Sequence, residues 1–353
     1  MLNISSYNSS EAAGEVIPPI AIISATIYCV IFLVGTLGNG LVIYVTGCRM
    51  KKTVNSVWFL NLALADFLFT GFLIFMIISA AQNYTWNFGN LMCKVCTFMS
   101  TVNMFASVFL LMAISLDRCL SIWVVVWAQN KRSVRKAQII TAVIWMTAVV
   151  CSSPYATFRG TTQYHSKIKC GYRPGTPHNI LKKFRFVVGF AIPFLVICIS
   201  YVAIAVRAKR LHKTNNRRSQ RIICAIILAF FICWLPFHVV QLVKPTGQIV
   251  NIVGPLSLCL GFINSCLNPI LYVFMCDEFQ KKLKQSIFSV LETALADDHL
   301  SFMSSRSLSS HLSRISRRSD SAAPSERKGT ATSLNFSECK VVMNHERETS
   351  STE

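Results

Sequence analysis

Two carboxylates stand apart from the other titratable groups of this chain. Asp66 and Asp117 are the only acidic residues between Val16 and Cys276, and each lies inside a long apolar stretch rather than in a connecting loop. In a segment that crosses a bilayer, a carboxylate costs about 2.5–3.5 kcal/mol on insertion scales unless it faces the protein interior. We therefore expect both aspartates to mark functional sites inside a membrane protein, and Asp117 to pair with its neighbour Arg118.

A cluster of cations is the second chemical feature. Residues 156–185 carry no acid, and their basic residues are Arg159, Lys167, Lys169, Arg173, Lys182, Lys183 and Arg185. Clustered positive charge concentrates acidic partners, and arginine grips a carboxylate through two parallel hydrogen bonds. Arg185 is the main candidate, because it lies about two helical turns before Pro193 and so inside an apolar span. The alternatives are that long loops are translocated regardless of charge and that Arg185 extends to the membrane interface.

The elements that hold these residues are apolar spans. Of the 353 residues, 53% are hydrophobic and 14% are charged. Seven spans near the ~20 residues that cross a bilayer lie at about 19–46, 57–81, 94–122, 137–155, 186–206, 222–243 and 250–275. Barrel-type alternation is absent, so the predicted fold class is an all-α membrane protein, a seven-transmembrane helix bundle over 19–276.

Lysine and arginine predict the orientation. The first nineteen residues contain neither, so we expect no cleaved signal peptide and an extracellular N-terminal tail, residues 1–18. Alternate loops hold Arg49 to Lys52, Lys131 to Lys136 and Arg207 to Arg221, the excess typical of the cytoplasmic side. The motifs at Asn3 and Asn8 then predict glycosylation outside the cell.

Two of the fourteen cysteines lie where a disulfide can form. Cys93 opens the third span on the outer side, and Cys170 lies in the basic extracellular segment, whereas most others lie within spans. Extracellular thiols meet an oxidising compartment. A Cys93–Cys170 bridge would hold the basic segment over the mouth of the bundle.

The C-terminal region divides into two parts. Residues 277–291 have apolar positions at helical spacing opposite lysines, which predicts a short amphipathic cytoplasmic helix on the inner leaflet. Residues 292–353 are rich in serine, threonine and arginine, which predicts a disordered tail with many phosphorylation sites, or else an inert spacer.

Motifs in successive spans resemble the rhodopsin-like (class A) G-protein-coupled receptors over about residues 20–290. They are Gly38-Asn39, Leu62-Ala-Leu-Ala-Asp66, Trp86-x-Phe-Gly89, Asp117-Arg118-Cys119, Trp145, Pro193, Tyr201, Cys233-Trp-Leu-Pro236 and Asn268-Pro-Ile-Leu-Tyr272. The stretches at 50–63, 115–119, 126–135 and 267–275 are similar to the chemoattractant branch, which includes chemerin and formyl-peptide receptors. The terminal Asn344–Thr349 resembles chemerin receptors within that branch.

The resemblance implies a switch at the cytoplasmic end. Freed Arg118 would meet Tyr201 and Tyr272, beside Asn268, and contact a G protein of the inhibitory type. Pro236 would supply the kink about which the sixth span swings. Cys119 stands where the family usually has tyrosine, and the inner end of the sixth span lacks the acid that could hold Arg118, so we expect measurable basal signalling. Arrestin and receptor kinases are the implied partners of the tail.

The resemblance also implies a sodium pocket. Asp66, Asn103, Ser107, Asn264 and Asn268 offer a carboxylate with hydroxyl and amide oxygens from three helices, the ligands that a hard monovalent cation prefers. The alternative is that these groups only hydrogen-bond to each other and to water. No other cofactor is expected.

For the ligand, the branch implies a chemerin-like peptide that inserts its C-terminus into the bundle. Arg185 would receive the carboxylate, with Phe98, Asn103, Gln241 and Trp234 as wall residues. Formyl-peptide receptors use a third-span aspartate where this chain has Thr101, which weakens that assignment.

Other function classes stay open to different degrees. A scavenging or arrestin-biased chemoattractant receptor, or a receptor for formyl peptides or lipid carboxylates, would share the fold. A transporter or channel would show internal repeats or a ring of pore charges. No nucleophile, base and oxyanion donor group together, so we expect no enzyme, and no nucleic-acid partner is expected.

Overall fold

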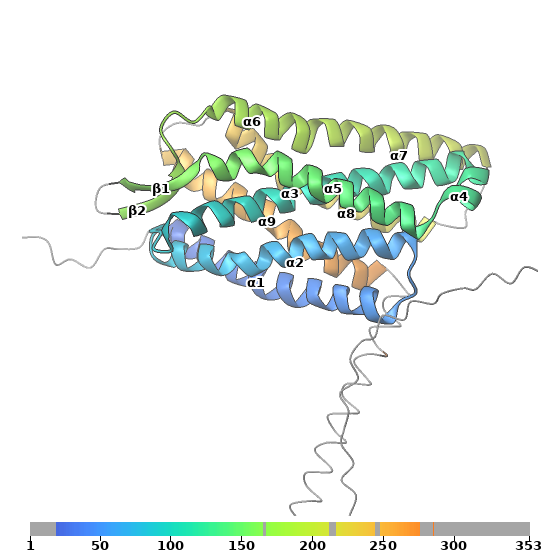
Figure 1. Cartoon of the computed structure of the whole chain (residues 1–353), viewed down its shortest axis with the longest axis horizontal. Coiled ribbons are helices and arrows are strands. Elements are labelled where there is room, and N and C mark those ends of the chain that lie inside the picture. The colour runs from blue at the N-terminus through green and yellow to red at the C-terminus, as the bar shows by residue number, and fades with distance from the viewer. Residues whose placement is uncertain (1–18, 165–166, 212–216, 244–247, 276–284, 286–353) are drawn as a thin grey trace, which may run out of the picture. The chain divides into compact units, whose positions relative to one another are not determined.

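The computed structural model describes residues 19–164, 167–211, 217–243, 248–275 and 285 (Figure 1). Several predictions lie outside these residues: the glycosylation sites Asn3 and Asn8, the amphipathic helix apart from Gln285, and the tail. Tyr272 lies in a described helix, but its side chain is outside the described set.

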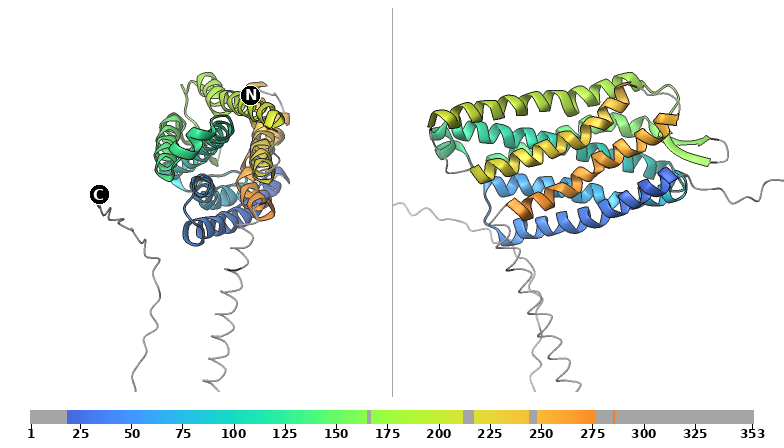
Figure 2. Two further views of the ribbon diagram at one scale, coloured as in Figure 1. Left: turned by 90° about the vertical axis from the view of Figure 1, so that its right-hand side faces the viewer. Right: turned by 180° about the vertical axis from the view of Figure 1, so that it is seen from behind.

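The seven-helix bundle predicted from the apolar spans is confirmed (Figure 2). The long helices are α1 (Pro19–Tyr44), α2 (Val54–Ala81), α3 (Gly89–Trp123), α5 (Val134–Thr157), α7 (Ile192–Leu211), α8 (Arg217–Val243) and α9 (Gln248–Met275). Shorter elements are a π-helical turn after α1 (Val45–Arg49), α4 (Val125–Lys131) and α6 (His178–Phe186). By length and composition, six described helices are able to cross a membrane, and α8 adds the shorter apolar segment Ile227–Val243.

The outward faces of the helices are apolar and several polar side chains are buried, which is the reverse of the pattern in a soluble protein. Leu37, Val150 and Ile199 expose most of their side chains, whereas Asn39 and Asp66 are fully buried. Apolar outward faces suit lipid, and polar groups in the interior join helices to one another. Asn39 illustrates this role, since its amide donates to the carbonyl oxygen of Ser265 at 2.8 Å and so connects α1 with α9.

Local signals explain where helices begin on the cytoplasmic side. Thr53 and Ser56 form a reciprocal capping box at the start of α2, in which each side chain bonds the other residue's backbone N–H. Ser133 caps α5 by accepting from the backbone N–H of Lys136 at 3.4 Å. Each cap satisfies amides that the first helical turn leaves without partners.

A β-hairpin covers the opposite end of the bundle, and the all-α prediction missed it. Strand β1 (Arg159–Tyr164) pairs antiparallel with β2 (Lys167–Tyr172), with Arg159 opposite Tyr172 and Thr161 opposite Cys170. Its strands are short, and their polar residue pattern does not predict strands from sequence. Contacts with parts of the chain that are distant in sequence stabilise the hairpin. The backbone N–H of Trp86 donates to the carbonyl of Ile168 at 2.8 Å.

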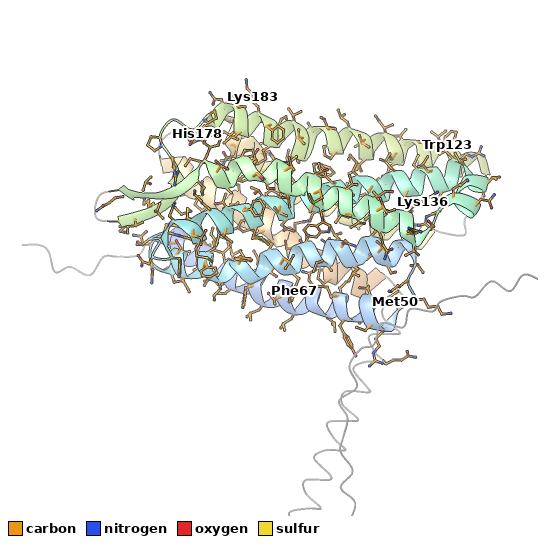
Figure 3. The ribbon with its side chains drawn as sticks, viewed as in Figure 1. Met50, Phe67, Trp123, Lys136, His178 and Lys183 are labelled. Carbon is orange, nitrogen blue, oxygen red and sulfur yellow. A yellow bond between two sulfur atoms is a disulfide. The ribbon has the colours of Figure 1, made fainter. Side chains whose placement is uncertain are left out.

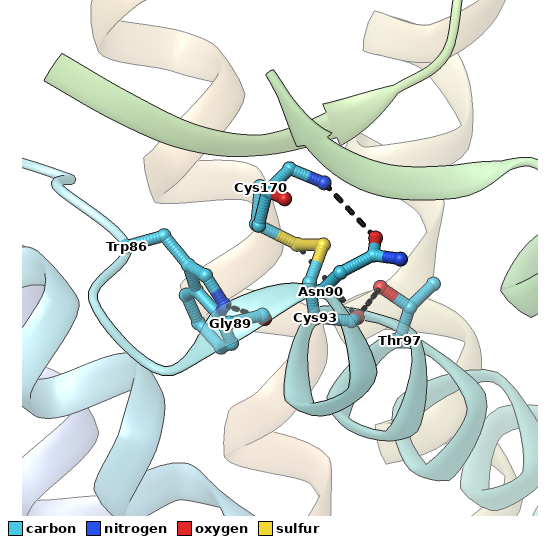
Figure 4. The surroundings of a disulfide bond; sticks show 7 residues. Trp86, Gly89, Asn90, Cys93, Thr97 and Cys170 are labelled. Carbon is cyan, nitrogen blue, oxygen red and sulfur yellow. Dashed lines mark hydrogen bonds between the residues drawn. A yellow bond between two sulfur atoms is a disulfide. The ribbon is translucent and has the colours of Figure 1, made fainter. Parts of the chain in front are cut away.

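The structure contains the predicted Cys93–Cys170 disulfide, which ties β2 to the start of α3 (Figure 4). Beside it, Asn90 accepts from the backbone N–H of Thr161 at 3.3 Å, and the Trp86 indole donates to the carbonyl of Gly89 at 2.9 Å. The hairpin is therefore held against the start of α3 by the disulfide and by hydrogen bonds of its backbone to Asn90 and Trp86.

The fifth span begins earlier than the sequence predicted. The predicted span covered about 186–206, with Arg185 already placed in its helix, but α6, a π-helical turn at Val187–Ala191 and α7 follow one another as helix from His178 to Leu211. Leu181 is buried, and its carbonyl accepts from the Tyr155 hydroxyl at 2.8 Å, which attaches this extension to α5. Arg185 consequently projects from a helix.

Candidate ligand cavity and switch residues

A cavity of about 410 Å³ lies beneath the hairpin end of the bundle. Its basic lining residues are Arg159, Lys169, His178, Lys182 and Arg185, and no described aspartate or glutamate lines it. Figure 3 labels His178 and Lys183 at this end and Met50, Trp123 and Lys136 at the other. A disulfide forms in an oxidising compartment, so the end with the bridge is the extracellular one and the cavity lies on that side of the bundle.

Arg185 is held by aromatic side chains. One of its terminal nitrogens donates to the Tyr172 hydroxyl at 3.2 Å, and its guanidinium carbon lies 4.3 Å from the Tyr155 ring centroid and 5.5 Å from that of Phe237. Its Nε is buried with no hydrogen-bond partner. Cation–π contacts orient a guanidinium without neutralising its charge, so Arg185 keeps donors available for an anion.

Arg159 is a second cation at the same place, and sequence reasoning had treated it only as one of seven basic residues. Its guanidinium carbon lies 4.6 Å from the Tyr172 ring centroid, and its Nε is also buried without a partner. Burial lowers the pKa of the guanidinium; Tyr172 opposes this shift and the charge of Arg185 adds to it. Only the hairpin register, which sets Arg159 opposite Tyr172, could have identified it.

Most of the remaining wall is aromatic or apolar, with a few uncharged polar side chains. On α8 the lining residues share one helical face and are Trp234, Phe237 and Gln241. Trp234 and Gln241 are two of the predicted wall residues. Far from the arginines in sequence, Phe262 of α9 packs on Phe69 and Tyr28, with centroid distances of 4.7 and 5.8 Å. The cavity thus joins a cationic part to an apolar part.

Two predicted wall residues do not line the cavity. On α3 the lining residues are Thr97, Ser100, Thr101 and Met104, which share one helical face. Phe98 is rotated about 100° from that face. Asn103 is buried toward α2 and α9 instead, where it belongs to a polar cluster below the cavity.

That cluster surrounds Asp66. The Asn268 amide donates to one carboxylate oxygen at 2.7 Å. The Asn103 amide is oriented so that its nitrogen faces hydrogen-bond acceptors. This nitrogen donates to the other Asp66 carboxylate oxygen at 3.2 Å, and the Asn103 side-chain oxygen accepts from the Ser265 hydroxyl at 3.1 Å. Ser265 is a member that sequence reasoning missed, since nothing in its neighbourhood distinguishes it.

The donor set fits a sodium ion. Asp66 is fully buried, Ser107 lies one turn from Asn103, and the side-chain oxygens of Asn264 and Asn268 are buried without a donor. Hydrogen bonds among the polar groups therefore leave the side-chain oxygens of Asn264 and Asn268 unsatisfied, and the amide nitrogen of the same Asn268 bonds the Asp66 carboxylate. Oxygen ligands of this kind suit a hard cation.

At the cytoplasmic end, the predicted Asp117–Arg118 pair is replaced by another. Arg132, between α4 and α5, grips Asp117 through Nε at 2.9 Å and Nη2 at 2.8 Å. Its Nη2 also donates to the Asn55 side-chain oxygen at 2.8 Å, and the same oxygen accepts from Arg118. Among the described residues Asp117 and Arg118 form no ion pair, because Arg132 occupies both carboxylate oxygens and Arg118 bonds Asn55 instead.

The other switch residues take their expected helices. Tyr201 on α7 lies near enough to Arg118 to interact with it electrostatically. Pro236 lies within α8, two residues after Trp234, whose indole N–H is buried without a partner. Pro269 follows Asn268 inside α9.

Comparison with known proteins agrees with this arrangement. The model of the family described as "7 transmembrane receptor (rhodopsin family)" matches residues 38–272. Chemerin-like receptor 1 of Homo sapiens is 42% identical over 297 residues, 77% of this chain and 79% of the relative. The C3a anaphylatoxin chemotactic receptor of Danio rerio is 38% identical over 83% of this chain and 82% of the relative's length. N-formyl peptide receptor 2 of Homo sapiens is 37% identical over 82% of this chain and 89% of the relative's length.

Proposed function

This chain belongs to the rhodopsin family of seven-transmembrane receptors, and on that premise we propose that it recognises the anionic C-terminus of a chemerin-like peptide and activates an inhibitory-type G protein. It is a multi-pass receptor of the plasma membrane for chemoattractant peptides, and not an enzyme. The proposal concerns the finer points: ligand, G protein and arrestin.

The observation that carries the proposal is the pair of arginines on Tyr172. Arg185 bonds its hydroxyl and Arg159 lies over its ring, and no acid stands among the described lining residues. Two partly desolvated cations near each other raise the free energy of the empty cavity, and a carboxylate between them lowers it. A peptide C-terminus supplies that carboxylate.

The remaining wall favours an apolar ligand segment behind the carboxylate. Phe237 touches Arg185, and Trp234 lies one turn deeper on α8, so the side chains before the C-terminus would rest on these rings. Thr101 lines the cavity where an aspartate would serve formyl-peptide recognition. This supports an acidic peptide over a formylated one.

Transmission uses the same helix. A ligand pressing on Trp234 and Phe237 acts two residues from Pro236, where the missing backbone N–H weakens α8. Movement of α8 would open the cytoplasmic end, where Arg118 is held by the neutral Asn55 rather than by an acid. Asp66, Asn103, Ser107, Ser265, Asn264 and Asn268 would hold sodium, which stabilises whichever state binds it more tightly. Phosphorylation of the tail by receptor kinases would then recruit arrestin.

The test measures inhibition of cyclic AMP by the C-terminal peptide of chemerin and by the same peptide with an amidated C-terminus. The wild-type receptor should respond to the acid far better than to the amide. Arg185→Ala should reduce the potency of the acid by about 30-fold or more and abolish its advantage over the amide. Lys183→Ala, at an exposed neighbouring position, is the matched control.

Three outcomes would overturn parts of the proposal. Equal potency of acid and amide would exclude a carboxylate clamp. Arrestin recruitment without a cyclic AMP response would favour the arrestin-biased or scavenging alternative. Response to a lipid carboxylate but not to the peptide would change the ligand class while keeping the anion site.

A further inference from the structure

We propose that Ser133 is a phosphorylation site for a kinase that recognises basic substrates, and that its phosphate withdraws Arg132 from Asp117. This inference goes beyond the proposed function, because it concerns the cytoplasmic end and requires no particular ligand.

Ser133 is accessible from the compartment that holds kinases and ATP. It is exposed and lies between α4 and α5, at the end of the bundle opposite the disulfide. Lys136, three residues later, marks this end in Figure 3. Arg132 and Ser133 have extended backbones, with φ/ψ of −81°/109° and −132°/154°, so the hydroxyl lies in the short break between two helices.

The surroundings of Ser133 match a kinase with an acidic substrate groove. Lys131 and Arg132 precede it, and Arg135 and Lys136 follow Val134. Lys131, Arg135 and Lys136 are exposed. No acidic residue lies between Asp117 and Asp277, so nothing nearby in sequence repels such a groove.

The chemical step is an ordinary phosphoryl transfer. The Ser133 Oγ attacks the γ-phosphorus of ATP, and a new P–O bond forms as the bond to the bridging oxygen breaks and ADP leaves. The hydroxyl proton passes to the kinase's base. The product carries about −1.5 to −2 charges and three acceptor oxygens.

The consequence follows from the position of Arg132. The extended backbone at residues 132 and 133 starts the two side chains on opposite sides, but the Arg132 side chain is long and 23% exposed, so rotation about its own bonds brings the guanidinium to a new anion on Ser133. A phosphate dianion attracts a guanidinium more strongly than the single charge of Asp117 does, and it forms the same bidentate contact. Asp117, only 11% exposed, would then lack its partner.

A buried carboxylate does not stay unpaired when a cation is near. With Arg132 gone, Arg118 is available, because it already interacts electrostatically with Asp117 and shares Asn55 with Arg132 in the unmodified receptor. Pairing of Arg118 with Asp117 restores the resting arrangement that the sequence had predicted. Phosphorylation of Ser133 therefore lowers basal coupling to the G protein.

The first measurement is incorporation of phosphate into full-length receptor in lipid nanodiscs. The receptor is incubated with ATP and the catalytic domain of protein kinase C, and phosphopeptides are identified by mass spectrometry. We expect phosphate on Ser133, none at this position in Ser133→Ala, and unchanged labelling of Ser133 in the control Ser121→Ala. Absence of phosphate from Ser133 in a reaction that labels the tail serines would overturn the site.

The second measurement is ligand-free nucleotide exchange on a purified inhibitory-type G protein. Phosphorylation should lower the exchange rate of wild type, Arg132→Gln should lower it without phosphorylation, and phosphorylation of Arg132→Gln should add nothing further. Each variant is compared with its Ser133→Ala counterpart, so that phosphates on the tail cancel. A full effect of Ser133 phosphate in Arg132→Gln would refute the role of Arg132.

Discussion

Arg132 holds Asp117 through both carboxylate oxygens, at 2.9 and 2.8 Å, and thereby occupies the acid that stands next to Arg118. Arg118 is left with the neutral side-chain oxygen of Asn55. An arginine held by an amide is released more readily than one held by a carboxylate. We therefore predict that the loop between α4 and α5 sets how firmly Arg118 is restrained.

Removal of the Asp117 charge should raise basal signalling. Asp117→Asn removes the acid with which Arg118 is able to pair whenever Arg132 releases it, and it leaves Arg132 without its ionic partner. We expect ligand-free exchange of a labelled GTP analogue to increase about fivefold or more over wild type. An unchanged rate at equal surface expression would show that Asp117 does not restrain Arg118. Basal exchange of wild type above empty membranes is part of the same prediction.

The Tyr172 hydroxyl should contribute modestly to ligand binding, and its ring should contribute more. Tyr172→Phe removes one neutral acceptor from Arg185, a loss of about 1 kcal/mol, or roughly fivefold in affinity. Tyr172→Leu also removes the ring under Arg159 and should weaken binding further. Competition binding with the labelled peptide distinguishes the two, and equal affinities of both variants would contradict the stacking of Arg159.

Sodium should lower agonist affinity through Asp66. Replacement of choline chloride by sodium chloride at constant ionic strength should weaken agonist binding to wild type by about fivefold. Asp66→Asn should bind agonist equally in both salts. It lacks the carboxylate charge that would hold sodium together with the side-chain oxygens of Asn264 and Asn268. Persistent sodium dependence in this variant would place the ion elsewhere; Leu68→Ala, at an exposed position of the same helix that does not line the ligand cavity, is the control.

Loss of the disulfide should both destabilise the receptor and weaken ligand binding. The Cys93–Cys170 bridge closes a separation of 77 residues, for which loop entropy gives about 4.5 kcal/mol. Cys170→Ser should lower the midpoint of thermal unfolding in detergent and reduce peptide affinity, because β2 carries Tyr172. Cys198→Ser, an exposed free cysteine of α7, should do neither. An unaltered affinity in Cys170→Ser would show that the hairpin stays in place without the bridge.

Much of the membrane architecture was accessible from sequence, because its causes are local. A helix in lipid must satisfy its own backbone, so each run of apolar residues announces a span. Alternate loops rich in lysine and arginine gave the orientation in the same way, and the position of Cys93 and Cys170 outside the spans predicted their bridge. The rarity of acids singled out Asp66, whose contact with Asn268 joins residues that the family motifs had already marked.

The remaining features depend on which side of a helix faces which neighbour. Asp117 and Arg118 are adjacent in sequence, yet the ion-pair partner of Asp117 comes from a loop fifteen residues away. Phe98 and Asn103 lie in the right helix on the wrong faces for the cavity, while Arg159 joins Arg185 only because the hairpin register sets it opposite Tyr172. Sequence alone determined which residues are too costly to bury without a purpose; the rotation and packing of the helices decided which of them meet, since those depend on contacts between distant parts of the chain.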